Sequence, residues 1–309
     1  MESCMDNYAR RGSKDFVEVI AKVIFTVCAF MAVLAVASIT IYMVMCGMPA
    51  IFEVGLGEIL FSSTWAPTAA NPQYGILYVV LTSIVGTTFA ILIGVPVGVL
   101  TAIFLAEVAP AKLAAIVKPA VELLAGIPSV VYGLLGIYLL NPLMYKLELA
   151  IFEDSKTHQF TGGANLLSAV LVLAIMILPT VINISETALK AVAPSIKSAS
   201  LALGATQIQT IFKVILPAAK SGVVTAVVLG VGRAIGEAMA ITLVSGSSVN
   251  VPLPFHSVRF LTTAIVSEMG YAEGLHRQVL FSIGLVLFIF IMLINVGLGR
   301  LLKGGSKDE

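Results

Sequence analysis

Six long apolar stretches divide the chain, and polar connections that carry most of the charges separate them. The stretches are Val23 to Met45, Ile76 to Ala106, Leu123 to Leu140, Leu166 to Ile184, Gly222 to Ser245 and Gln278 to Gly299. A helix needs about 20 mostly apolar residues to cross the hydrocarbon core of a bilayer. The pattern therefore predicts an all-α polytopic membrane protein with six transmembrane helices.

Composition agrees with this prediction. The 309 residues are 59% hydrophobic and 11% charged, with a mean hydropathy of +1.03, whereas about a quarter of the residues of a soluble domain are charged. The net charge is only +1, and the basic residues are dispersed rather than clustered, which argues against a nucleic-acid partner. The first apolar stretch exceeds the apolar core of a signal peptide, which spans about 7 to 15 residues, so we expect it to be a retained helix.

Lysines and arginines gather in alternate connections. Thirteen of them fall on the side of the N-terminus, namely Arg10, Arg11, Lys14, Lys22, Lys112, Lys118, Lys190, Lys197, Lys213, Lys220, Arg300, Lys303 and Lys307. The opposite side holds Lys146, Lys156, Arg259 and Arg277. Because positively charged loops stay in the cytoplasm, this distribution predicts that both termini are cytoplasmic and that the protein is a multi-pass protein of the cell membrane.

Small residues mark two of the predicted helices. Gly94 and Gly98 flank Pro96 in the second stretch, which predicts a bend at the proline and a face for close helix contact. In the fifth stretch Gly232, Gly236 and Ala240 recur every four residues and predict a second close-packing face. The sequence leaves open whether the bent helix serves packing alone or a transport path.

Arg233 and Glu237 place two charges inside the fifth stretch, which is otherwise uncharged from Ser221 to Ser245. Arg233 lies eleven residues after Gly222, which is about 16 Å along a helix and near the middle of a bilayer. Residues four apart share one face of a helix and can partly compensate each other. Ionisable groups at this depth are functional-site candidates by default, and the alternative is an ion pair that only fixes helix register.

Catalytic and metal-binding signatures are missing from the sequence. It contains no phosphate-binding GxxxxGK[ST] motif, and Cys4, Cys28 and Cys46 have no ligand spacing. The three histidines, His158, His256 and His276, have no second ligand at helical spacing, so we expect no metal site. An intramembrane enzyme is therefore the weaker alternative to a transport protein.

The predicted outer connections differ in character. Cys46 to Gly75 carries Trp65 and three prolines and is expected to be an aromatic-anchored segment, and Asn141 to Asn165 is expected to be a mobile loop. Between the fifth and sixth stretches, Leu261 to Met269 has apolar residues at helical spacing and predicts a short helix at the outer mouth.

The inner connection from 185 to 221 predicts a compact projecting element. Glu186 and Lys190 are four apart at a helix end, Pro194 ends that helix, and two further short helices meet at Gly204. They offer the apolar side chains of Leu201, Leu203 and Ile208 to another surface.

This loop resembles the "EAA" loop of bacterial ABC-importer permeases. Ser198-Ala199-Ser200 is followed by Gly204 at the family's spacing and by Val214-Ile215-Leu216-Pro217, although serine replaces the usual first Glu and second Ala. The resemblance implies that the loop docks into a cytoplasmic ATPase. The residues that it assigns to coupling are Ser198, Ala199, Ser200, Leu201, Gly204, Ala205, Leu216 and Pro217. The alternative is a loop that only packs against its own bundle.

Two further motifs resemble the PstC-type permease subunits of bacterial phosphate importers. They are Ala125-Gly126-Ile127-Pro128-Ser129-Val130-Val131-Tyr132-Gly133 and Gly232-Arg233-Ala234-Ile235-Gly236-Glu237-Ala238-Met239-Ala240. The resemblance implies a type I ABC-importer (MetI-like) fold, with an N-terminal part over 1–75, a five-helix core over 76–300 and a tail over 301–309. It also implies that Arg233 and Glu237 belong to the substrate pathway.

The same resemblance implies the partners. These are a paralogous PstA-like permease, a homodimeric PstB-like ATPase that holds ATP and Mg, an extracytoplasmic PstS-like phosphate-binding protein, inorganic phosphate and the lipid bilayer. This chain itself would hold no cofactor. The alternative substrate is another oxyanion, such as sulfate or molybdate, or another solute.

Overall fold

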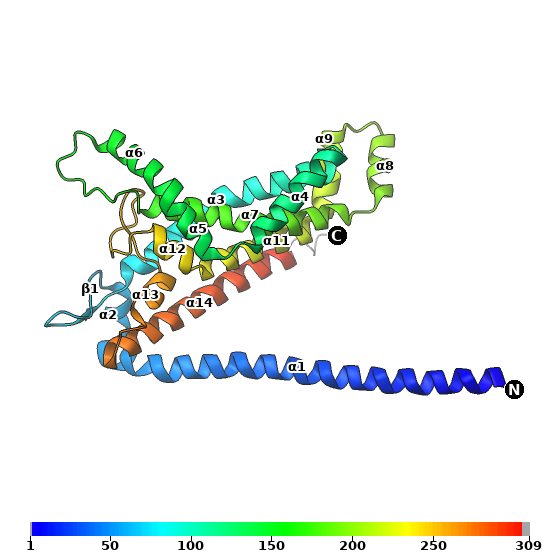
Figure 1. Cartoon of the computed structure of the whole chain (residues 1–309), viewed down its shortest axis with the longest axis horizontal. Coiled ribbons are helices and arrows are strands. Elements are labelled where there is room, and N and C mark those ends of the chain that lie inside the picture. The colour runs from blue at the N-terminus through cyan, green and yellow to red at the C-terminus, as the bar shows by residue number, and fades with distance from the viewer. Residues whose placement is uncertain (1, 305–309) are drawn as a thin grey trace.

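The computed structural model describes residues 2–304, which fold into a bundle of long helices with one small β-hairpin (Figure 1). The helices are α1 (Glu2–Val54), α2 (Leu56–Phe61), α3 (Leu77–Ile103), α4 (Ala111–Gly126), α5 (Ser129–Leu135), α6 (Asn141–Phe152), α7 (Leu166–Lys190), α8 (Pro194–Ala202), α9 (Gln207–Thr210), α10 (Leu216–Ala218), α11 (Lys220–Gly236), α12 (Met239–Val244), α13 (Leu261–Glu268) and α14 (Gly274–Gly304). Three π-helical turns, η1 (Phe104–Val108), η2 (Gly136–Leu140) and η3 (Ile211–Ile215), continue or join them. Strands β1 (Trp65–Ala66) and β2 (Gln73–Tyr74) pair antiparallel.

The helical membrane architecture predicted from the apolar pattern is confirmed. Within the described residues five helices are long and apolar enough to cross a bilayer, and a sixth span forms if one bent pair is counted. That pair is Gln207–Ala218 with Lys220–Gly236, which meet at 72°. The fifth predicted stretch therefore begins with a sharp turn on its N-terminal side.

The third predicted stretch is wrong at its start, because Leu123 belongs to α4 and the span itself begins at Ser129. Ile127 and Pro128 are extended between the two helices, as expected because a proline disfavours helical geometry in the residue before it. The Tyr132 hydroxyl donates to the carbonyl oxygen of Leu124 at 2.7 Å and ties the two helices together across the break.

The outer connection after this span also differs from the prediction. Residues 141–152 are not loop but helix α6, which extends the span to Phe152. Only residues 153–165 form a loop, and Asn165 caps α7 by accepting the backbone N–H of Ser168 at 3.0 Å. The predicted outer helix after the fifth stretch is present as α13.

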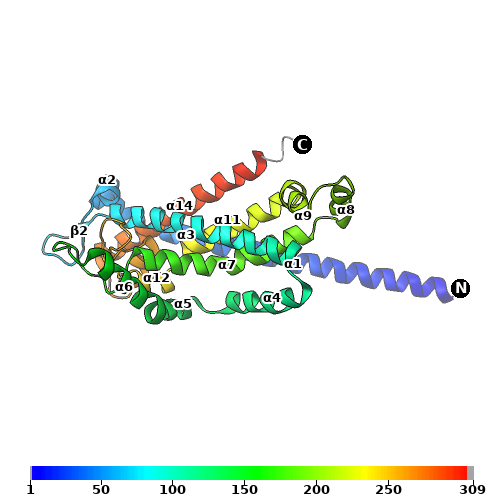
Figure 2. The same cartoon turned by 90° about the horizontal axis from the view of Figure 1, so that it is seen from above.

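Helix α7 is the centre of the bundle, with α3 and α11 beside it (Figures 1 and 2). Glycines on both neighbours face it closely. A Cβ atom at Gly94 would lie 2.6 Å from Ile177, and one at Gly98 would lie 2.8 Å from Val181. Helix α3 remains continuous through Pro96. Gly94 and Gly98, which lie on either side of the proline, therefore both face α7.

Helix α1 stands apart from this bundle. It contacts α14 near its C-terminal end, where a Cβ at Gly47 would lie 3.0 Å from the backbone of Ser282. Between Glu18 and Met45 the helix is mostly exposed, and it diverges from α14 (Figure 1). The beginning of α1 and the end of α14 both point toward the end of the bundle that carries α8 and α9.

We expect Gly94→Ala to destabilise the protein by about 1–3 kcal/mol, because the added methyl group overpacks the contact with α7. Thermal unfolding in detergent measures the effect. Gly232→Ala is the matched control, since no described heavy atom lies within 4 Å of a Cβ at Gly232. Equal stability of the two variants would contradict this account of the interface.

Candidate functional site

The two charges singled out in the fifth stretch lie on either side of a helix end. Helix α11 stops at Gly236, Glu237 is extended with φ −72° and ψ 131°, and α12 begins at Met239. The prediction that Arg233 and Glu237 share one helical face is therefore wrong. Within the described residues the two side chains form no ion pair, because the Glu237 carboxylate accepts the backbone N–H of Ala240 at 3.0 Å instead.

Arg233 turns toward the central helix. Its Nη1 donates to the hydroxyl oxygen of Thr180 on α7 at 3.2 Å, and the side chain is half-buried. Because this hydroxyl is neutral, it does not compensate the positive charge of the guanidinium. Because Arg233 lies in the last turn of α11, the carbonyl groups at the helix end favour its positive charge.

Glu237 fastens the helix break to the outer part of the molecule. Its backbone carbonyl accepts the hydroxyl of Thr262 on α13 at 2.7 Å. Beyond the break Ala240 is fully buried, and a Cβ at Gly133 on α5 would lie 3.0 Å from its Cα. The break is thus held from α13 and from α5.

The predicted packing face of the fifth stretch is divided by the same break. Ala240 belongs to α12, whereas Gly232 and Gly236 belong to α11, and a Cβ added at either glycine would have no described heavy atom within 4 Å. Close contact at these two glycines stays a prediction for a partner chain. Gly222 and Gly230 contact α7 instead, where added Cβ atoms would lie 2.4 Å from Ala188 and 2.9 Å from Val181.

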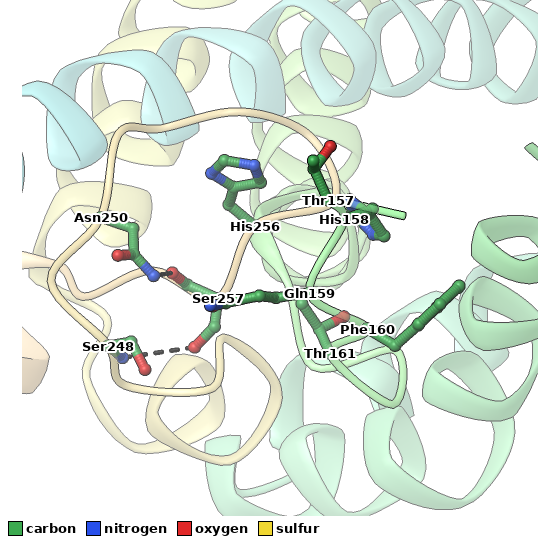
Figure 3. Close-up of a pocket in the computed structure, with 9 residues that line it drawn as sticks. All are labelled: Thr157, His158, Gln159, Phe160, Thr161, Ser248, Asn250, His256 and Ser257. Atoms are coloured by element: carbon green, nitrogen blue, oxygen red, sulfur yellow. Dashed lines mark hydrogen bonds between the residues drawn. The ribbon is translucent and has the colours of Figure 1, made fainter. Parts of the chain in front are cut away.

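A polar pocket of about 350 Å³ opens at the opposite end of the bundle from α8 and α9, where two loops meet (Figure 3). Asn250 and the backbone N–H of Ser248 donate to Ser257 on one side. On the other side His158 lies 2.8 Å from the fully buried carboxylate of Glu148. His256 also lines the pocket, but no group of three metal-ligating side chains occurs within the described residues.

Glu268 organises a second cluster at this end. Its carboxylate accepts the Trp65 indole N–H at 3.1 Å, pairs with the Arg259 guanidinium and lies 2.7 Å from His276. These groups join the hairpin, the loop before α13, α13 itself and α14. Nearby, burial and secondarily the Glu53 carboxylate raise the pKa of Tyr74 on the hairpin, so its phenol stays neutral above its usual range.

The inner loop has the predicted shape. Helices α8 and α9 are separated by Gly204, whose φ of 87° favours glycine. The Thr206 hydroxyl accepts the backbone N–H of Gln209, which caps α9, and the hydroxyls of Ser200 and Thr210 join α8 to α9 at 2.9 Å. Leu203 is 89% exposed and Ile208 is 70% exposed, so the tip is apolar.

The other residues assigned to this loop lie along its length. Ser198 bonds back to the carbonyl of Pro194, and Ala199 and Leu201 lie on α8, none of whose side chains is buried. The backbone N–H of Ala205 bonds to the carbonyl of Ser200. Leu216 and Pro217 form α10 at the turn into α11.

Charged contacts inside the inner end were only partly foreseen. The predicted Glu186–Lys190 pair is present at 2.6 Å. Lys118 on α4 also approaches the Glu186 carboxylate, at 3.5 Å. Sequence reasoning missed three polar contacts of the sites, Thr180 with Arg233, Thr262 with Glu237, and Lys197 with Glu107. A polar Thr180 inside an apolar stretch was the one available local signal.

Comparison with known proteins shows what this arrangement is similar to. Residues 94–303 match the family described as binding-protein-dependent transport system inner membrane component. A probable ABC transporter permease protein of Bacillus subtilis, YqgH, is 40% identical over 92% of both chains. The phosphate transport system permease protein PstC of Haemophilus influenzae is 34% identical over 89% of both chains.

Solved structures show the same fold. The inward-facing MetNI methionine ABC transporter aligns with a TM-score of 0.53 and 24% identity, covering 75% of this chain and 94% of that one. A bacterial alginate ABC transporter aligns with a TM-score of 0.63 and 16% identity, covering 90% and 95%. At these identities the likeness carries the fold alone.

We expect Glu268→Gln to destabilise the outer cluster by roughly 3 kcal/mol, because it removes one partner of a buried ion pair and leaves Arg259 uncompensated. The apparent unfolding temperature in detergent should fall. Glu273→Gln is the matched control, since Glu273 is an exposed carboxylate a few residues away. If both variants unfolded at the same temperature, Glu268 would not hold these outer segments together.

Proposed function

The chain belongs to the family of binding-protein-dependent transport system inner membrane components, and we propose that it forms half of the translocation pathway of an ATP-driven phosphate importer. It is a permease component of an ABC importer and thus a transport subunit. The observation that carries the substrate is its similarity, at 33–34% identity, to several proteins named phosphate transport system permease protein PstC.

The geometry around Arg233 supports an anion substrate. Arginine carries a permanent charge and a planar donor fork that matches phosphate oxygens. Here one amino group is held by Thr180, which orients the side chain, and the partner is neutral. A bound anion would complete the hydrogen bonding of the guanidinium and replace water that the ion loses on entering the membrane.

The helix break beside it supports a pathway. Irregular backbone at membrane depth is tolerated where protein buries it or where it lines a water-filled cavity. At the break a carboxylate follows the arginine by four residues in the chain, and within the described residues it accepts the backbone N–H of Ala240 and forms no ion pair with Arg233. Conduction requires that an ion can also leave its site, and in this proposal Glu237 tempers the attraction of Arg233 for phosphate.

The inner loop is the coupling element of the proposal. Leu203 and Ile208 give it an apolar tip that suits a groove of the cytoplasmic ATPase. Beyond the tip the chain runs through η3 and α10 and turns by 72° into α11, the helix that carries Arg233. A displacement of the loop by ATP-driven closure would therefore reach the pathway through one continuous segment.

The proposed complex contains a paralogous permease subunit, a homodimeric ATPase that binds ATP and Mg, and an extracytoplasmic phosphate-binding protein. It lies in the bacterial inner membrane, with α8 and α9 on the cytoplasmic side. Both ends of the helical chain would then also be cytoplasmic, because α1 begins and α14 ends toward that side in Figure 1.

We expect Arg233→Ala to lower phosphate uptake about tenfold or more, since it removes a charge-assisted contact with the anion. The measurement is uptake of labelled phosphate by vesicles that contain the assembled complex. Uptake by Arg233→Lys should lie between that of the parental complex and that of Arg233→Ala, because lysine keeps the charge but lacks the planar pair of donors of the guanidinium.

Thr180→Val is the matched control for Arg233. It removes the observed hydrogen bond and keeps the guanidinium, so we expect most of the uptake to remain. Parental uptake by an assembled Arg233→Ala complex would contradict the pathway role. Equal losses in Arg233→Ala and Thr180→Val would show instead that the bond between α11 and α7 is what matters.

We expect Leu203→Glu to release the ATPase, because it places a charge at the most exposed apolar position of the inner loop. Co-purification of the ATPase with the permease pair measures this. Leu253→Glu, at a similarly apolar position 48% exposed in an outer loop, should leave the ATPase attached. Intact co-purification of the Leu203→Glu complex would contradict docking through this tip.

A further inference from the structure

Glu107 holds the inner loop from a position far away in the sequence. It lies in the π-helical turn η1, which continues directly from α3. Its carboxylate contacts the Lys197 ammonium on α8 at 2.5 Å, and its backbone carbonyl accepts the side-chain amide of Gln207 on α9 at 3.1 Å. One residue therefore binds both short helices of the loop.

Burial makes this attachment important for α8. No side chain of α8 is buried, so apolar packing contributes little to its position. The Glu107 side chain is only 8% exposed, and the Lys197 side chain is 37% exposed. A carboxylate that has lost most of its water needs its cation, and leaving it unpaired is costly.

The far end of this attachment is closely packed against the rest of the bundle. Helix α3 packs on α7 through Gly94 and Gly98. Ala102 and Ile103, just before η1, share an apolar cluster with Ile211 and Ile215 of η3. The inner loop thus has two routes into the membrane-spanning part, one along its own chain into α11 and one across the ion pair into α3.

We infer that Glu107 and Lys197 form a joint through which displacement of α8 is transmitted to α3, in parallel with the covalent route into α11. Glu107 is a positioning residue in this role and touches no substrate. The inference rests on the proposed coupling function of the loop. It assigns the closing movement of the pathway to α3 and α11 together, the two helices that flank α7 and both contact Val181.

Glu107→Gln in the full complex tests the joint, and the charge swap Glu107→Lys with Lys197→Glu tests whether the pairing itself matters. In proteoliposomes we expect the Glu107→Gln permease to assemble with its ATPase. We expect the amount of phosphate imported per ATP hydrolysed to fall about fivefold or more. The swap should restore most of this ratio. Lys190→Gln is the matched control, because it removes an ion pair from the same side of the membrane while Glu186 keeps Lys118.

A second measurement does not depend on the substrate. Spin labels at Ile196 on α8 and Leu92 on α3, both exposed, report how firmly the two helices are held together. The distance distribution between them should broaden in Glu107→Gln and narrow again in the swap. A purely local stabilising role would broaden it without changing the import ratio.

The outcomes separate the joint from the proposed function. An unchanged distance distribution and an unchanged import ratio in Glu107→Gln would each overturn the joint, and so would a swap that restores neither. A parental complex that fails to import phosphate would contradict the proposed substrate. The labelled pair would then still decide whether Glu107 fixes α8 to α3.

Discussion

Close packing of two helices against α7 is the constraint on which the rest of the structure depends. Helices α3 and α11 both present glycines to it, Gly94 and Gly98 from one side and Gly222 and Gly230 from the other. Lipid is as apolar as a leucine side chain, so burial of apolar surface gives helices in a membrane little reason to associate, and dispersion at close range must do so. The glycines supply that close range, and the hydrogen bond from Arg233 to Thr180 lies next to the contact of Gly230 with Val181.

Polar side chains also hold the helices and loops together, mainly at the two ends of the bundle. At one end Glu268 on α13 gathers groups from three other segments. At the other end Glu107 holds α8 and α9, and Glu186 on α7 contacts Lys118 on α4. Between them the break at Glu237 is satisfied by its own carboxylate and by Thr262. The centre of the bundle therefore keeps one guanidinium whose hydrogen-bond partner is uncharged.

The sequence predicted the features that depend on long local runs. Apolar length was enough for the helices that span, and Gly204 with its flanking residues was enough for the shape of the inner loop. The end of α11 could not be predicted in this way, because Gly236 looks like Gly232 in sequence. What distinguishes Gly236 is the residue after it. The Glu237 carboxylate accepts the backbone N–H of Ala240, and its carbonyl accepts the hydroxyl of Thr262, which lies 25 residues later in the chain. The contact of Lys197 with Glu107 spans 90 residues and has no local signal at all.

Val181 carries a consequence for how this bundle can change over evolutionary time. One of its methyl groups faces Gly98 on α3 and the other faces Gly230 on α11, at 2.8 and 2.9 Å from where Cβ atoms would stand. A larger residue at this position would collide with two helices at once, and a smaller one would open a void against both. A substitution of Val181 would therefore require compensating substitutions on α3 and on α11 at the same time. Such a triple change is hard to reach by single mutations.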